Sequence, residues 1–198
     1  MVTRIERCLP KYMSCGIIGY VRLGHGIAKY LFGQNIKPLV FDVDSVKMVE
    51  AYKDGCVPAN KSNLLKSCDL IFCATGSGSI SLSEFSILKR GCYVASVTSS
   101  EDEFDLLGLQ NKFAETALNR YVTRLENSNT YFHMLNKGDA VNFLGGDRVG
   151  DFIRLVQAEI LAGLHFIAMS DCSAGISEVS ERTRTEIADQ FLSKYLRV

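Results

Sequence analysis

Residues 16–26 read GIIGYVRLGHG, and this stretch decides the fold class. A short apolar run, spaced glycines and then a helical pattern follow one another, which is the order of a strand–loop–helix unit that binds phosphates. The dinucleotide fingerprint is G-x-G-x-x-G, and Gly19 and Gly24 occupy its first and third glycine positions. Val21 occupies the second, where glycine lets a pyrophosphate approach the backbone. The loop therefore predicts a nucleotide site that has to accommodate a valine.

The chain from residue 14 to residue 100 alternates short apolar runs with helical patterns. This alternation predicts an α/β protein with a Rossmann-type, doubly wound, mainly parallel sheet and helices on both faces. Ser45 is the predicted N-cap of the second helix, and Gly55 is its predicted stop. The predicted strands are 14–20, 37–44, 68–76 and 91–99, and the predicted helices are about 23–33, 45–55 and the segment 81–90.

The pattern changes after residue 100. Residues 120–146 predict short strands with turns at 126–129 and 136–139. A long apolar helix is predicted over 149–169, and an amphipathic, polar helix over about 177–196. No repeat or Pro-rich linker separates these parts, so the sequence predicts a single Rossmann domain over residues 1–198 that includes the helices of 149–196.

Composition and charge narrow the classes of partner. Lys plus Arg and Asp plus Glu both total 22, so the formal net charge is zero and neither nucleic acid nor an anionic membrane is an expected partner. No uninterrupted apolar run reaches the roughly 18 residues of a membrane span, and residues 1–10 lack an apolar signal core. The seven cysteines show no C-x-x-C spacing, so neither a disulfide framework nor a metal site is expected. These features predict a cytoplasmic protein.

The position of Asp42 supports a dinucleotide ligand. Asp42 lies 23 residues after Gly19, at the end of the second predicted strand, where a carboxylate binds the adenosine ribose hydroxyls in NAD-binding folds. A carboxylate there also repels a 2′-phosphate, which favours NAD over NADP. The alternative is that Gly19, Gly24 and Gly26 serve only tight turns and helix–strand packing.

A resemblance to a known family rests on several short motifs in order. GYVRLGHG (19–26), the pair Asp42 and Asp44, CATG (73–76), YVASVTS (93–99), RYVTRL (120–125) and AVN (140–142) stand where the NAD-binding domain of S-adenosylhomocysteine hydrolase has its motifs. The match covers roughly residues 12–168. It implies that the chain resembles the NAD-binding part of this hydrolase, in which bound NAD transiently oxidises the substrate ribose before homocysteine is eliminated and water is added.

The resemblance also implies which residues would contact the cofactor, with Asn142 holding the nicotinamide carboxamide. The sequence departs from the family pattern at three of these positions. Val21 replaces a glycine, Lys47 stands where the family has Asn, and Ser99 stands where the family has His. It assigns no catalytic residue and no metal ligand to this chain. The implied cofactor-binding residues are Gly19, Val21, Arg22, Leu23, Gly24, His25, Gly26, Asp42, Lys47, Thr75, Gly76, Val97, Thr98, Ser99 and Asn142.

The family's substrate-binding and proton-transferring residues lie mainly in a domain before the glycine loop, whereas about 18 residues precede the loop here. The chain is therefore expected to be part of a longer protein, or a diverged relative working with a separate substrate domain, and unable to complete the hydrolysis alone. The family also implies a homo-oligomer. Two alternatives stay open: a non-catalytic Rossmann module that senses nucleotides or binds partners, and a free-standing NAD dehydrogenase, which fits poorly because no catalytic acid–base set is visible.

Several other residues have a plainer interpretation. His25 is expected to face solvent near the helix start, His165 to be a satisfied core or interface residue, and His133 to lie in a strand without a nearby nucleophile. Residues 99–105, SSEDEFD, are expected to form a solvated loop or a helix N-terminus rather than a metal site.

Overall fold

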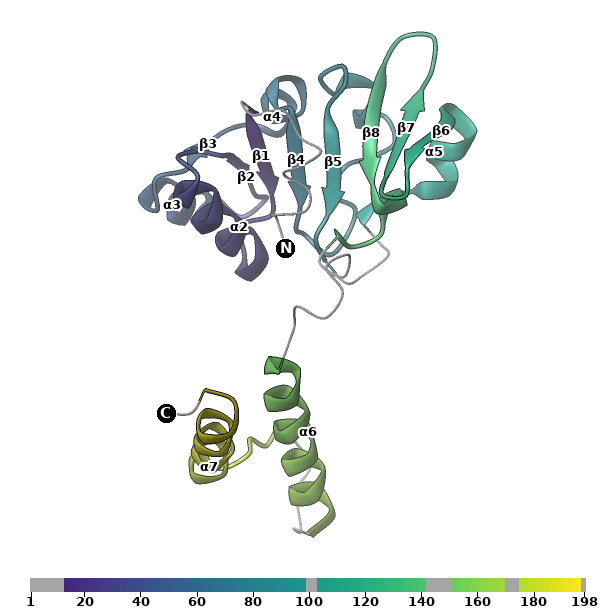
Figure 1. Ribbon diagram of the computed structural model, residues 1–198. Helices are drawn as coiled ribbons and strands as arrows, with labels where there is room; N and C mark the ends of the chain where they lie inside the picture. The colour runs from purple at the N-terminus through teal and green to yellow at the C-terminus, as the bar shows by residue number, and fades with distance from the viewer. Residues whose placement is uncertain (1–12, 99–102, 142–150, 170–174, 197–198) are drawn as a thin grey trace. The chain divides into compact units, whose positions relative to one another are not determined.

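One mixed sheet organises the first part of the chain, in the strand order β3-β2-β1-β4-β5-β8-β7-β6 (Figure 1). The structure is a computed structural model, and it describes residues 13–98, 103–141, 151–169 and 175–196. Contacts divide the chain into two compact units, residues 1–145 and 146–198, which are described separately. The single domain over 1–198 stays a prediction. The strands are β1 (Cys15–Ile18), β2 (Leu39–Phe41), β3 (Val57–Pro58), β4 (Leu70–Cys73), β5 (Tyr93–Ser96), β6 (Ala114–Asn119), β7 (Val122–Glu126) and β8 (Tyr131–Leu135).

The pairing directions confirm the doubly wound, mainly parallel sheet. Strands β3, β2, β1, β4, β5 and β8 pair in parallel, while β8–β7 and β7–β6 pair antiparallel. The order runs outward from β1 to one side through β2 and β3, and to the other side through β4 and β5. The chain therefore reverses its direction of winding between β1 and β4, and ligands bind at such a point, outside the carboxyl ends of the strands.

Helices cover both faces of this sheet, which is why it has two apolar cores. On one face, α2 (Arg22–Gly33) and α3 (Ser45–Lys53) bury residues such as Leu31 and Ala51 against Ile17 and Phe72. On the other, the core contains Leu64, Phe85, Leu109 and Phe132. That face is covered by α4 (Lys61–Ser67), α5 (Leu106–Lys112) and the short 3-10 turn η2 (Glu84–Ile87).

Several predicted boundaries change in the structure. The N-cap of α3 is Asp44, whose carboxylate accepts a hydrogen bond from the Val46 N–H at 2.8 Å, so the prediction of Ser45 was wrong. Gly55 does follow the helix, with a φ of +95° that favours glycine. The helix predicted within 81–90 is only the turn η2. Strand β3 and helices α4 and α5 were not predicted, because they are only two to seven residues long.

Both edges of the sheet are irregular. At one edge, every residue of β6 is exposed, and its pairing with β7 shifts register between Ala117 and Asn119. At the other edge, β3 consists of two exposed residues, one of which is Pro58. The turns predicted at 126–129 and 136–139 are confirmed: the first joins β7 to β8, and the second contains the 3-10 turn η4 (Asn136–Gly138).

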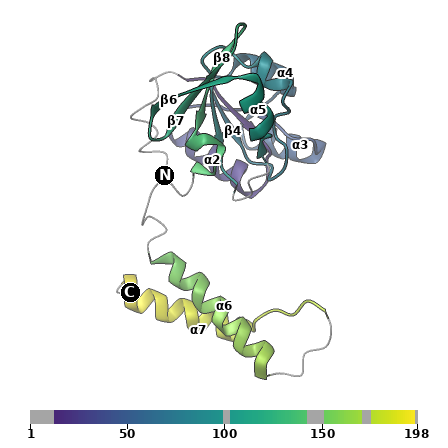
Figure 2. The same ribbon diagram turned by 90° about the vertical axis from the view of Figure 1, so that its right-hand side faces the viewer.

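The second unit contains two helices that lie side by side, α6 (Phe152–Met169) and α7 (Glu181–Phe191), followed by a π-helical turn, Leu192–Leu196 (Figure 2). Aromatic rings join them: Phe191 lies 5.4 Å from Phe152 and 5.0 Å from Tyr195, measured between ring centroids. The segment 180–186 lies mostly on a solvent-exposed face at the start of α7, with Arg182 paired to Glu186 at 2.9 Å.

Helix α6 changes one expectation about membranes. It spans 18 residues with a mean hydropathy of 1.5, so by length and composition alone it is able to cross a membrane. None of its described side chains is buried within the structure. Its exposed apolar residues include Phe152, Ile160, Leu161, Leu164 and Ile167. The expectation that no segment is long and apolar enough rested on uninterrupted apolar runs, and Arg154 and Glu159 interrupt the run in this helix.

Candidate functional site

A cavity of about 330 Å³ opens at the carboxyl ends of β1, β2 and β4, where the winding of the sheet reverses. Its volume lies at the lower end of the range typical of small-molecule sites. Three segments form its walls: the glycine loop after β1, the acidic end of β2 and the loop after β4. The lining residues are Ile18, Gly19, Val21, Phe41, Asp42, Val43, Lys61, Thr75, Ser77, Gly78 and Ser79.

Gly19 and Gly24 are needed for the shape of the loop itself. Gly19 has a φ of +95°, and a Cβ atom there would lie 2.7 Å from the Ala74 carbonyl oxygen. A Cβ atom at Gly24 would lie only 2.0 Å from the carbonyl oxygen of Gly19. A Cβ atom at Gly26, by contrast, would meet nothing within 4 Å. Two of the three glycines therefore have a structural requirement, and the third has none in this chain.

Val21 lies between the loop and helix α2, at the N-cap position, and its side chain makes no capping hydrogen bond. The residue is 58% exposed and its side chain lines the cavity. The first intrahelical hydrogen bond runs from the His25 N–H to the Val21 carbonyl at 2.9 Å. The N–H groups of the first turn, at Arg22, Leu23 and Gly24, therefore precede the helical ladder, and such groups favour an anion.

The Asp42 carboxylate is fixed by the backbone on both sides. Its Oδ2 accepts a hydrogen bond from the Tyr20 N–H at 2.6 Å, and its Oδ1 accepts one from the Asp44 N–H at 2.9 Å. A carboxylate has about four acceptor positions, so two remain for hydroxyl groups of a ligand. Asp42 lines the cavity, as the spacing from Gly19 predicted.

Glu103 joins the ends of β4 and β5 and was missed by the sequence analysis. Glu103 is 1% exposed, so the prediction of a solvated loop is wrong for this residue, whereas the predicted alternative of a helix N-terminus is confirmed at Asp105, which caps α5. Its Oε1 accepts hydrogen bonds from the Gly76 N–H at 2.7 Å and the Thr98 hydroxyl at 2.8 Å, and its Oε2 accepts one from the Thr75 hydroxyl at 2.8 Å. Burial raises the pKa of this carboxyl, but hydrogen bonds from Gly76, Ser79, Thr75 and Thr98 outweigh burial and hold the pKa below its usual value.

Lys61 and the segment Ser77–Ser79 are further cavity residues that the sequence analysis did not single out. The Lys61 ammonium lies 2.8 Å from Oε2 of Glu84, which also accepts a hydrogen bond from the Ser81 N–H at 2.8 Å. This pairing connects α4 to the loop after β4. The motif TGSGS (75–79) could have indicated this loop from the sequence, because it alternates glycine with hydroxyl-bearing residues just after a buried strand.

Several other predicted site residues that the structure describes are not among those lining the cavity. His25 faces Asp54, with Nε2 3.5 Å from Oδ2, and its ring meets that of Tyr20 edge-on at 5.8 Å. Lys47 pairs with Glu50 at 2.7 Å. Val97 is buried in the core, at 2% exposure. Ser99 and Asn142 lie outside the described residues.

Where the structure describes them, the remaining histidines and cysteines do not line the cavity. His133 is half-buried in β8, where burial lowers its pKa and its ring stacks on Tyr93 at 4.4 Å. His165 is exposed on α6, so it is not a core residue of its unit, and the alternative of an interface position stays a prediction. Burial raises the pKa of the Cys68 thiol to about 11. Within the described ranges, no group of three or more His, Cys, Asp or Glu side chains is placed to hold a metal ion.

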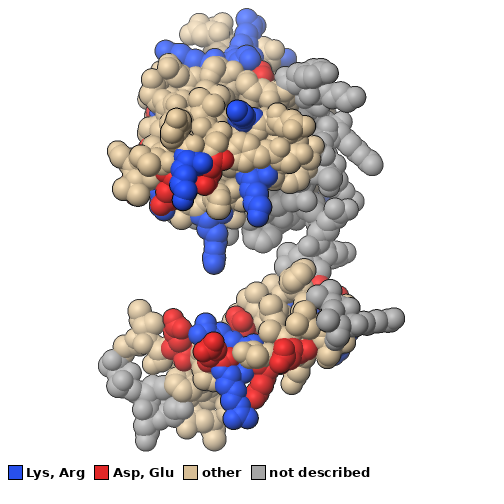
Figure 3. Space-filling model, turned by 90° about the vertical axis from the view of Figure 1, so that its left-hand side faces the viewer, with Lys and Arg blue, Asp and Glu red and all other residues tan. Residues whose placement is uncertain are grey.

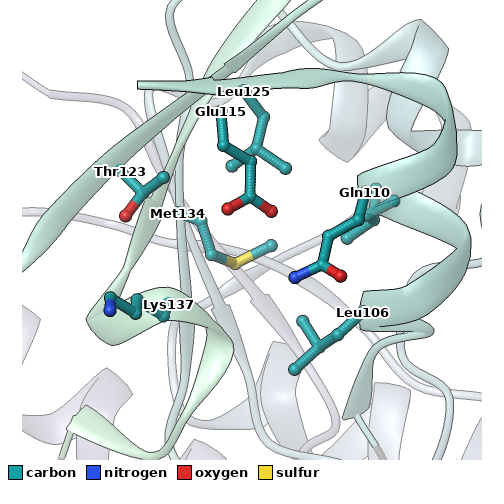
Figure 4. Close-up of a pocket in the computed structure, with 8 residues that line it drawn as sticks. Leu106, Gln110, Glu115, Thr123, Leu125, Met134 and Lys137 are labelled. Atoms are coloured by element: carbon teal, nitrogen blue, oxygen red, sulfur yellow. The ribbon is translucent and has the colours of Figure 1, made fainter. Parts of the chain in front are cut away.

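A second cavity, of about 180 Å³, lies between α5 and the antiparallel strands (Figure 4). Its floor contains Leu125 and Met134, and the Glu115 carboxylate and Gln110 amide extend toward it from β6 and α5. This volume is below the roughly 300 Å³ at which small-molecule sites begin. On the face of the first unit seen in Figure 3, Lys and Arg are scattered, and some of them lie beside Asp or Glu.

Comparison with known proteins identifies the family. The model of the "S-adenosyl-L-homocysteine hydrolase, NAD binding domain" matches residues 7–147, which include the glycine loop, Asp42 and Glu103. The chain belongs to this family. The resemblance seen in the sequence is thereby confirmed, and so is NAD as the cofactor of the domain. The family match covers nearly all of the first unit, and the cavity described above lies within it.

Members of the hydrolase family are similar to this chain over most of its length but are much longer. An S-inosyl-L-homocysteine hydrolase from Methanosarcina mazei is 25% identical over 190 residues, which are 94% of this chain and 46% of that protein. An adenosylhomocysteinase from Thermotoga maritima is 30% identical over 139 residues, 66% of this chain and 33% of that protein. The chain thus spans less than half the length of these relatives. Among solved structures, D-lactate dehydrogenase from Aquifex aeolicus, complexed with NAD and lactic acid, is 25% identical with a TM-score of 0.44, covering 51% of this chain and 31% of that one.

The residues at the cavity fit NAD in most respects. The fixed Asp42 carboxylate has acceptor positions left for ribose hydroxyls, and the first turn of α2 presents N–H groups suited to a pyrophosphate. The Val21 side chain stands at the same turn, where the family pattern has glycine. The fit is therefore good at the adenosine end and crowded at the pyrophosphate.

Proposed function

We propose that this chain is the NAD-binding part of a hydrolase that acts on S-adenosylhomocysteine or on a related nucleoside thioether. The observation that carries the proposal is the cavity at the winding reversal, with the Asp42 carboxylate fixed at the end of β2. The names of the relatives support the reaction class: adenosylhomocysteinase and S-inosyl-L-homocysteine hydrolase both release homocysteine from a nucleoside.

In this proposal the cofactor residues have distinct roles. Asp42 binds the adenosine ribose, and the first turn of α2 binds the pyrophosphate. Thr75, Gly76, Val97 and Thr98, at the ends of β4 and β5, support the nicotinamide half, and Ser99 and Asn142 are proposed to reach it. When bound, NAD supplies reversible acceptance of a hydride from the substrate. This chain's own residues hold the cofactor and orient it; we assign none of them to proton transfer.

We further propose that the reaction needs a substrate domain that these 198 residues do not contain. The support is the coverage of the relatives, of which this chain matches 46% or less in the two cases above. A separate chain or another segment of the same protein would then bind the nucleoside. NAD-dependent hydrolysis would appear only when both parts are present.

The proposal is tested by cofactor binding and by activity. The purified chain is titrated with NAD by calorimetry and then incubated with NAD and either S-adenosylhomocysteine or S-inosylhomocysteine. Homocysteine release is followed by chromatography, because the chain's own seven cysteines would react with a thiol reagent. We expect NAD binding without homocysteine release. Release by the chain alone would contradict the need for a separate substrate domain, and absence of NAD binding would contradict the cofactor role.

A second candidate function, a non-catalytic Rossmann module, is favoured by one observation. Val21 lines the cavity at the turn where the pyrophosphate would approach, so weak binding would suit a nucleotide sensor or an interaction domain. A Kd for NAD well below the cellular concentration of the cofactor would favour the hydrolase function. Binding only at millimolar NAD would favour the non-catalytic module.

We also propose that the protein is a cytoplasmic homo-oligomer. In this proposal, apolar residues of α6 such as Ile160 and Leu164 contact a second copy of the chain. Their exposure within their own unit supports this role. Free thiols at Cys15, Cys56 and Cys68 suit a reducing compartment. Analytical ultracentrifugation and cell fractionation test both points. A monomer, or recovery of the protein only with detergent, would contradict them.

A further inference from the structure

Glu103 is an ionised group buried without a cation beside it in the described part of the structure. Neutral donors hold its carboxylate: the Gly76 N–H and the Thr75 and Thr98 hydroxyls, with the Ser79 hydroxyl also interacting with this residue. No ion pair is found for it among the described residues. A buried charge costs free energy unless something offsets it, and neutral donors offset it only in part. Counting the described residues alone, this site therefore carries a net negative charge, on a residue that is 1% exposed.

The position of this charge is at the carboxyl ends of β4 and β5. Thr75 and Gly76 follow β4, and Thr98 follows β5 by two residues. Asp42 marks the other half of the fold, at the end of β2. In a doubly wound sheet the two halves of a dinucleotide lie on the two sides of the winding reversal. The half that carries Asp42 takes the adenosine, so Glu103 belongs to the half that takes the nicotinamide.

The charge of the nicotinamide ring changes during the redox step. The oxidised ring is a cation, and the reduced ring is neutral. A fixed negative charge nearby attracts the cationic ring and has little effect on the neutral ring. Because a buried charge is screened less by water and salt, this difference in interaction energy between the two forms is preserved.

We propose that Glu103 is a positioning residue for the nicotinamide half of the cofactor: it fixes the ends of β4 and β5 and makes the site prefer the oxidised cofactor to the reduced one. This inference rests on NAD binding at the cavity. It adds that the site is tuned to retain NAD in the form that begins the reaction.

The substitution Glu103→Gln separates the charge from the shape. The amide oxygen can still accept from the Gly76 N–H and the Thr98 hydroxyl. The Thr75 hydroxyl already lies 3.0 Å from the Ser77 carbonyl, so it can donate there and accept from the new amide N–H₂. The hydrogen bonds are thereby conserved in number while the negative charge is removed.

The experiment is a pair of titrations of the full chain, with NAD and with its reduced form, by calorimetry. For a unit charge about 10 Å away at an effective dielectric of about 20, the preference changes by on the order of 10-fold. We expect E103Q to weaken the binding of NAD by this factor and to leave the reduced form nearly unchanged. Glu115→Gln, an exposed glutamate on β6, is the matched control and should leave both affinities unchanged.

Glu103→Asp provides the converse test and remains usable if E103Q does not fold. It keeps the charge and shortens the side chain, so it should weaken both forms of the cofactor together and preserve their ratio. Equal effects of E103Q on both forms, or a changed ratio in E103D, would overturn the inference while leaving NAD binding intact. If the unmodified chain binds neither form, the cofactor site itself is wrong.

Discussion

Replacing Val21 with glycine should increase the affinity for NAD. Val21 is 58% exposed, lines the cavity and begins helix α2, where N–H groups are available to a pyrophosphate. Removing the side chain lets the pyrophosphate approach these donors. Each charge-assisted hydrogen bond gained contributes roughly 1.5–3 kcal/mol, which corresponds to a gain of about 10- to 150-fold in affinity.

The stability of the fold should change little in this variant. Val21 makes no capping hydrogen bond through its side chain, and glycine is preferred to valine at N-cap positions. This preference offsets the entropy that a glycine adds to the unfolded chain, about 0.5–1 kcal/mol. Thermal unfolding without ligand therefore shows whether an affinity change reflects the site alone.

The assay is calorimetric titration of the wild type, Val21→Gly and Val21→Ala with NAD. Alanine should give an intermediate gain. Val49→Ala is the matched control, because Val49 is 68% exposed on α3 and does not line the cavity. Equal affinity of the wild type and Val21→Gly would refute the steric reasoning, since the donors would then be equally accessible with and without the side chain.

Three further predictions concern the loop, the ribose and the response to acid. Gly24→Ala should lower the free energy of unfolding by about 3 kcal/mol because its Cβ would lie 2.0 Å from a carbonyl oxygen, whereas Gly26→Ala should raise it by about 0.5–1 kcal/mol, both measured by urea denaturation. Asp42→Asn should narrow the preference for NAD over NADP by about 10-fold in paired titrations, because a carboxylate repels the 2′-phosphate. Burial raises the pKa of Asp69, but Lys89, 2.6 Å away, helps to hold that pKa below its usual value. The Asp69–Lys89 pair should therefore stabilise the fold by about 1 kcal/mol above about pH 4, and this stabilisation should be lost as the pH falls. Asp69→Asn should remove this pH dependence of stability.

Each of these has a result that would contradict it. Equal destabilisation by the two alanines would mean that the glycine loop tolerates the close contact. An unchanged NAD-to-NADP ratio would remove Asp42 from ribose recognition. A constant difference in stability between the wild type and Asp69→Asn from pH 7 down to pH 2 would show that the Asp69 carboxylate does not titrate differently in the folded chain.

The sequence was most informative where local pattern decides structure. The spacing from Gly19 to Asp42 placed both residues at one cavity, because a strand, a tight turn, a helix and a second strand leave little freedom in their arrangement. The strand–loop–helix order is local, and the apolar runs of β1, β4 and β5 are buried on both faces, which makes them easy to recognise.

Other parts of the site depend on contacts that the sequence does not reveal. Glu103 is acidic and stands among acidic neighbours, so its composition indicates a solvated loop. Its burial comes from Thr75 and Gly76, 28 and 27 residues away along the chain. Lys61 joins the cavity through α4, a helix of seven residues that shows too little periodicity to be predicted. The choice of Asp44 over Ser45 as N-cap likewise depends on backbone geometry.

The two irregular edges of the sheet limit how copies of this protein can associate. A strand from another molecule would have to pair with β6 or β3. Along β6 the register shift between Ala117 and Asn119 interrupts the row of backbone groups, and Glu115 adds a charge there. Beside β3, Pro58 has no N–H to donate. Continuous sheets running from one molecule into the next, and the fibres that grow from them, are disfavoured at both ends.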